Sequence, residues 1–90
     1  MKFGLFGINT GPCADPDTML AVSAAAEAAG FESLWTGEHV VLPDPQVPPS
    51  PAPPMTAMVH PFTSLAYIAS ATDQILLGTG ITLIAQRNAV

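Results

Sequence analysis

The segment Gly30–Val40, with the sequence GFESLWTGEHV, limits the possible folds more than any other part of the chain. It begins with a glycine that can end a helix in the left-handed conformation and continues as a short apolar strand, Ser33–Thr36. A polar pair, Glu38 and His39, follows that strand directly. Because parallel α/β folds present functional groups at the carboxyl ends of their strands, this order predicts a strand that delivers both side chains to a site.

The segments on either side of it extend an alternation of strands and helices. Asp15 and Pro16 suit the N-cap and the first position of a helix, and Pro61 suits the first position of another. Such alternation selects parallel strands, and it begins both an open doubly wound sheet and a (β/α)8 (TIM) barrel, which three strands cannot close. The expected elements are strands at residues 2–8, 33–36 and 75–85 and helices at residues 15–29 and 61–73.

A proline-rich loop separates the second strand from the second helix. Residues 43–61 contain eight prolines, which exclude regular secondary structure there. Residues 48–51 and 51–54 both have the PxxP form of a polyproline ligand, but no basic residue flanks them. We therefore interpret residues 43–61 as a stiff loop or lid on the face where the functional groups gather.

The composition excludes several kinds of partner. Two basic residues against seven acidic ones give a formal net charge of -5, which argues against binding of nucleic acid. A single cysteine excludes an internal disulfide and a multi-cysteine metal cluster, and it fits a reducing, cytoplasmic location. We find no signal peptide and no apolar run near the ~20 residues that cross a bilayer, so we expect no membrane contact.

Few side chains are candidates for chemistry. His39 could orient or protonate a bound group, or it could merely cap the strand end through a backbone hydrogen bond. Glu38 could tune His39 only if the backbone turns, because neighbouring strand residues point to opposite faces, and it is expected to be solvated. His60 should occupy the N-cap of the second helix in a local structural role, and Cys13 lies in a turn without a neighbouring base. These residues have no recognised metal-ligand spacing, so we expect no metal.

Glycines in the third strand need a separate explanation. Gly78-Thr79-Gly80 is similar to part of a dinucleotide-binding fingerprint, but Leu83 replaces the third glycine and the segment continues as a strand. A glycine inside a buried strand more often marks a bulge, or a place where the flat face of a ligand approaches the backbone.

Three segments together resemble the N-terminal part of the luciferase-like monooxygenases, the bacterial luciferase superfamily: KFGLFGIN, PDTMLAVSAAAEAAGFESLWTGEHVVLP and PFTSLAYIASATDQILLGTGITLIAQRNAV. The resemblance implies that residues 1–90 are the first three βα units of an incomplete TIM barrel domain. It further implies a full-length parent enzyme that uses reduced FMN or the deazaflavin coenzyme F420. Such enzymes act on small-molecule substrates with molecular oxygen or by hydride transfer.

The same resemblance assigns residues to the site. It implies that His39 lies near the cofactor ring and the substrate, and that Glu38 helps to hold it. Gly80 and Ile81 would form a bulge, often with a non-prolyl cis peptide, that supports one face of the ring. Relatives usually have aspartate in place of His60 and proline in place of Ala89, and both differences weaken helix starts.

Residues 88–90 predict the start of a further helix, so we expect the chain to be part of a longer protein and to be inactive alone. In the family, the absent strands four to eight carry the residues that bind the phosphate. The alternative is an inactive structural or self-associating half-barrel that binds no cofactor. A homo-oligomer is expected in that case, because the edge and the apolar face of the third strand would be exposed.

Overall fold

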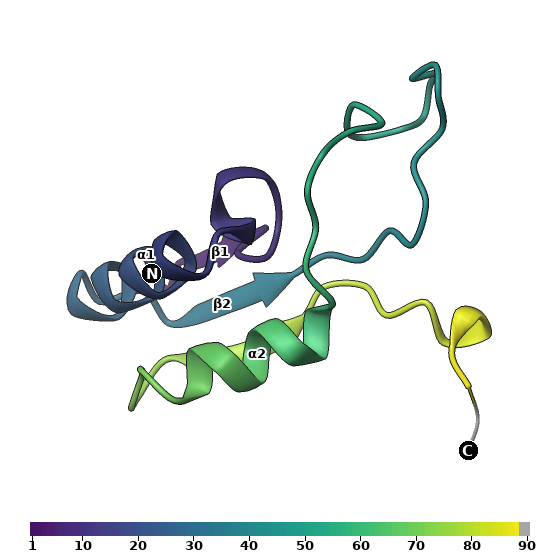
Figure 1. Ribbon diagram of the computed structural model, residues 1–90. Coiled ribbons are helices and arrows are strands. Elements are labelled where there is room, and N and C mark those ends of the chain that lie inside the picture. Colours follow the sequence, from purple (N-terminus) through teal and green to yellow (C-terminus); the bar gives the residue numbers. More distant parts are fainter. Residues whose placement is uncertain (89–90) are drawn as a thin grey trace.

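Two strand-helix-strand units make up the fold in the computed structural model, which describes residues 1–88 (Figure 1). The three strands are parallel and lie in the order β1-β2-β3, which confirms the predicted α/β alternation. The helix expected to start at residues 88–90 lies mostly outside the described residues. The elements are β1 (Gly4–Phe6), the 3-10 turn η1 (Gly11–Ala14), α1 (Pro16–Ala28), β2 (Ser33–Thr36), α2 (Pro61–Ala69), β3 (Leu76–Thr79) and the 3-10 turn η2 (Ile84–Gln86).

Helix α1 starts and ends at the residues that the sequence predicts. The Asp15 carboxylate accepts a hydrogen bond from the Thr18 backbone N–H at 2.9 Å, and Pro16 takes the first helical position. That bond, together with one from the Thr18 hydroxyl, lowers the pKa of Asp15. At the other end Gly30 has a φ of +85°, the left-handed conformation that ends a helix without steric cost.

Strand β2 has the predicted bounds, but β1, β3 and α2 are shorter than predicted, for local reasons. Strand β1 ends at Phe6 because Gly7, with a φ of +88°, turns the chain away. Strand β3 ends at Thr79, and the predicted continuation to residue 85 is wrong, because β2 itself ends at Thr36 and leaves no neighbour to pair with. Helix α2 ends at Ala69 and not near residue 73. Directly after this end, the hydroxyls of Ser70 and Thr72 donate hydrogen bonds to carbonyls of the last helical turn.

The core lies between the sheet and the two helices, which cover the same face and contact each other. Alternation along β2 places Leu34 on this face, fully buried, while Trp35 points to the opposite side. The apolar core consists of Ile8, Met19, Ala26, Leu34, Ile68 and Ile75.

Glu27, near the end of α1, joins the helix to the start of β3. Its carboxylate accepts hydrogen bonds from the backbone N–H groups of Gln74 at 2.7 Å and Ile75 at 2.9 Å. These bonds lower the pKa of Glu27, with the bond from Ile75 contributing most. A charged side chain therefore satisfies backbone donors that precede the strand.

Aromatic rings and glycines fit together on the face that no helix covers. The Trp35 ring lies across the sheet, and a Cβ added to Gly78 would come within 2.7 Å of it. The Phe6 ring lies against Gly80, where an added Cβ would be only 2.5 Å from a ring carbon. The rings that lie against Gly78, in β3, and Gly80, directly after it, are therefore those of the chain's own aromatic side chains.

We predict that Gly78→Ala destabilises the chain by about 1–2 kcal/mol, because the new methyl group would collide with the Trp35 ring. Gly78 is not among the glycines with a positive φ, so the cost comes from this collision and not from backbone strain. In a Trp35→Leu background the cost should largely disappear, since the shorter side chain does not reach over the glycine. Urea unfolding followed by circular dichroism measures both values, and equal costs in the two backgrounds would contradict this explanation.

Candidate active site

The carboxyl ends of β1 and β2 are joined by one buried side chain, that of Asn9. Its amide nitrogen donates to the Gly37 carbonyl and to the Val59 carbonyl, both at 2.8 Å. Its amide oxygen accepts from the Gly37 N–H at 3.1 Å. Asn9 is completely buried, so water does not compete for these bonds. Two strand ends and the last part of the proline-rich loop are thus held by a single residue.

Backbone pairing brings the proline-rich loop back to the site. The Val59 N–H donates to the Asn9 carbonyl and the Gly11 N–H donates to the Ala57 carbonyl, each at 2.9 Å. Between these bonds Thr10 and Met58 form an isolated antiparallel bridge. The rest of the loop extends away from the sheet without helix or strand, as its prolines predict (Figure 1).

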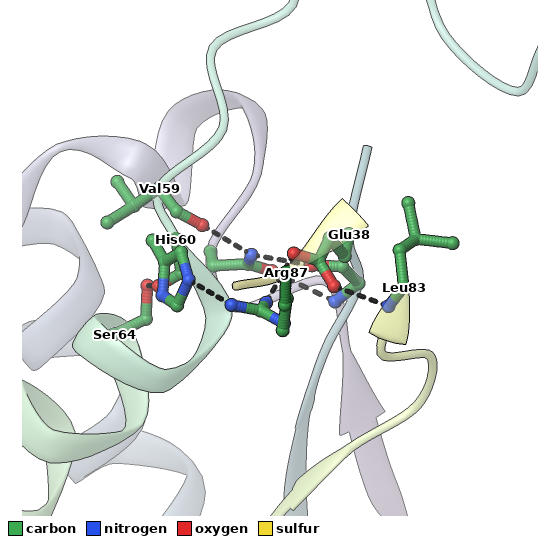
Figure 2. Close-up of polar contacts among 8 residues, drawn as sticks. Glu38, Val59, His60, Ser64, Leu83 and Arg87 are labelled. Carbon is green, nitrogen blue, oxygen red and sulfur yellow. Dashed lines mark hydrogen bonds and ion pairs between the residues drawn. The ribbon is translucent and has the colours of Figure 1, made fainter. Parts of the chain in front are cut away.

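Glu38 is buried, with only 8% of its surface exposed, so the expectation that it is solvated is wrong. One carboxylate oxygen accepts from the Leu83 N–H at 2.7 Å and the other pairs with the Arg87 guanidinium (Figure 2). These two partners hold the pKa of Glu38 below its ordinary value of 4.5, the Leu83 bond contributing most, although burial opposes them. The carboxylate binds this pair and not His39, the partner that the resemblance implied.

Arg87 connects Glu38 to the N-terminus of α2. Its Nη1 lies 2.5 Å from Nε2 of His60 (Figure 2). Its guanidinium lies 4.7 Å above the centre of the Phe62 ring. His60 does occupy the predicted N-cap, but its side chain makes no capping bond. Its carbonyl accepts from the Ser64 N–H and hydroxyl, both at 3.0 Å, while its ring reaches the segment after β3.

His39 is exposed, unlike its neighbour Glu38, and it makes no hydrogen bond to another residue in the described part of the chain. The strand-capping bond considered for it is therefore not present. The side chain instead lines a cavity of about 340 Å³ between the strand ends and the proline-rich loop. Other walls of this cavity are Phe6, Pro51, Thr56, Met58 and Ile81.

Gly80 and Ile81 lie where β3 leaves the sheet. The Gly80 N–H donates to the Thr36 carbonyl at 2.8 Å. Among the described residues, no later backbone hydrogen bond joins the segment after β2 to the segment after β3. Ile81 is then exposed and faces the cavity. Their peptide bond is trans, so the cis peptide expected here is absent, and the cis bonds found in residues 1–88 precede Pro45 and Pro49.

Sequence reasoning missed Asn9 and Arg87. A buried-looking strand that ends in Asn9 and Thr10 was a signal, because a polar side chain in such a place needs partners. Nothing in the local sequence pointed to the Arg87 contacts.

Within residues 1–88, no three His, Cys, Asp or Glu side chains are placed to hold a metal ion, and no helix is long and apolar enough to span a membrane.

Comparison with known proteins gave a match at the level of a family. The sequence model of the family described as luciferase-like monooxygenase matches residues 1–90. No curated protein and no solved structure matches the chain.

We predict that Glu38→Gln lowers stability at neutral pH, because the amide keeps an acceptor for Leu83 but loses the charge that pairs with Arg87. The folded-state pKa of Glu38 is lowered, so the carboxylate stabilises fully above its ordinary value of 4.5. That contribution is lost as the pH falls through the lower folded value. Urea midpoints measured from neutral to acid pH should therefore converge for the two proteins.

Glu32→Gln is the matched control. Glu32 pairs with Lys2 at 2.9 Å, but these side chains are 37% and 79% exposed. Exposed ion pairs contribute little to stability, so this variant should unfold close to the wild type. If both variants lower the midpoint equally, the effect of Glu38→Gln does not come from its buried pairing.

Proposed function

The chain belongs to the luciferase-like monooxygenase family, and we propose that it forms the His39 side of an oxidoreductase site that works with reduced FMN or coenzyme F420. The observation that carries the proposal is the cavity at the strand carboxyl ends, which is lined by His39, a side chain without a hydrogen-bond partner among residues 1–88. In parallel α/β folds this edge of the sheet is where ligands bind. The substrate is a small molecule that reaches His39 from the loop side.

The cavity suits the ring of such a cofactor. A flat heteroaromatic ring needs apolar contact on its faces and hydrogen-bonding groups at its edge. Apolar contact is provided by Phe6, Met58 and Ile81. Hydrogen-bonding groups are provided by His39 and Thr56. The cofactor would supply electrons as a hydride or, for reduced FMN, by reaction with oxygen.

The phosphate of the cofactor needs a partner outside this cavity. The chain has two basic residues, Lys2 and Arg87, and both are already in ion pairs, with Glu32 and Glu38. We therefore assign the ring end of the cofactor to residues 1–88 and its phosphate to a further part of a complete TIM barrel. In this assignment His39 exchanges a proton with the substrate or orients it, and Ile81 backs the ring beside Phe6, which covers Gly80.

One observation favours the alternative of a self-associating half-barrel without cofactor. Phe6, Leu76 and Ile81 are more than half exposed around the sheet face that no helix covers. Burying that face against a second copy would remove it from water. Analytical ultracentrifugation with and without FMN or F420 separates the two cases. A cofactor site predicts that the cofactor sediments with the chain while the oligomeric state of the chain stays unchanged, and the alternative predicts an oligomer that binds no cofactor.

We predict that His39→Ala weakens binding of the cofactor to the chain and slows turnover of a full-length parent by about 10²–10⁴, the usual contribution of a positioned acid or base. Stability should change little, since the side chain is exposed and makes no hydrogen bond to the described residues. Fluorescence titration with FMN, reduced FMN and F420 measures affinity and also distinguishes the cofactors. Val40→Ala, at an exposed neighbouring residue, is the control, and unchanged turnover in His39→Ala would contradict the assignment.

A further inference from the structure

We propose that Arg87 is the positioning residue of this site: by binding Glu38 and the neutral ring of His60 at once, it fixes the direction in which His39 enters the cavity. This inference rests on the proposed function in one respect only, the identity of the ligand that binds in the cavity. The contacts of Arg87, and their effect on His39, can be tested without any ligand.

Arg87 joins two segments that are distant in the sequence. Its Nη1 faces His60, at the end of the proline-rich loop, and its Nη2 binds Glu38, which follows β2 (Figure 2). The planar guanidinium can donate in both directions without changing conformation. Its packing over Phe62 further restricts the side chain. A lysine ammonium has no such fork and could not maintain both contacts.

The effect on His39 passes through the backbone of Glu38. The Glu38 carboxylate is held by Leu83 on one oxygen and by Arg87 on the other, on the buried side of the chain. Gly37, just before it, is fixed on both its N–H and its carbonyl by Asn9. Because Gly37 and Glu38 are both held, the backbone that carries the next side chain, that of His39, is held as well. His39 is exposed and lines the cavity together with these two residues.

The other contact of Arg87 requires a neutral His60. All guanidinium N–H groups are donors, so the facing Nε2 must be an acceptor and the ring proton must be on Nδ1. The groups that face His60 in residues 1–88 are the Arg87 cation, the Glu38 carboxylate and the edge of the Phe62 ring. A second proton on His60 would place an N–H donor against a cation, so only the neutral ring can make this contact.

The first experiment compares Arg87→Lys with the wild type at about pH 8, where a free histidine side chain is neutral. NMR spectra of the His39 ring report its surroundings, and amide hydrogen exchange at Leu83 reports the Glu38 contact. We expect shifted His39 signals, faster exchange at Leu83 and cofactor affinity lower by about tenfold. Lys2→Arg, at the other basic residue, should change none of these. Unchanged His39 signals in Arg87→Lys would overturn the proposal.

The second experiment does not require Arg87 variants to fold. His60→Gln replaces the ring by an amide oxygen that can still accept from Arg87, whereas His60→Leu removes the acceptor. At about pH 8, exchange at Leu83 should stay close to the wild-type rate in His60→Gln and be faster in His60→Leu. Equal exchange rates in the two variants would overturn the role of the His60 contact. If the wild type binds neither FMN nor F420 but these differences appear, the proposed function fails and the role of Arg87 stands.

Discussion

The arrangement of the site depends on the buried amide of Asn9. Both of its N–H groups and its oxygen are used, and every partner is a backbone group, of Gly37 or Val59. A backbone partner cannot rotate away as a side chain can, so these bonds fix where β2 ends and where the proline-rich loop returns. Removing the amide would leave buried backbone groups unpaired at two places, which costs more than the bonds themselves contribute. The bonds to Gly37 thus hold the backbone immediately before Glu38 and His39.

The two faces of the sheet are stabilised differently. One is covered by α1 and α2 around Leu34 and Ile68, in the usual manner of an α/β fold. On the other face, the Trp35 ring lies over Gly78 of β3 and the Phe6 ring lies over Gly80, directly after the strand. The aromatic rings take the space that side chains at these two positions would occupy, which explains why glycine is tolerated there. It also means that a ring bound near Ile81 would contact Phe6 as well as the backbone.

The sequence predicted the surroundings of the site better than its contacts. The Glu-His pair after β2 was identified from the sequence. Glu38 was expected to be solvated, but it is buried. Burial of a carboxylate requires partners. One of them, Leu83, lies in a segment that the sequence assigned to a longer strand, and the other, Arg87, follows that segment. For His60, the local pattern predicted the N-cap correctly, whereas its ring contact with Arg87 had no local signal.

Local physical chemistry alone determined the order and type of the elements. Asp15-Pro16 starts a helix, Gly30 ends it, apolar alternation gives the strands, and the prolines of residues 43–61 keep the intervening loop irregular. Only the tertiary structure decided which polar groups meet, such as Asn9 with Val59, 50 residues apart, and Arg87 with Glu38, 49 residues apart. A hydrogen-bonding side chain shows in the sequence that it needs a partner. Which partner it finds depends on where the folded backbone places the other donors and acceptors.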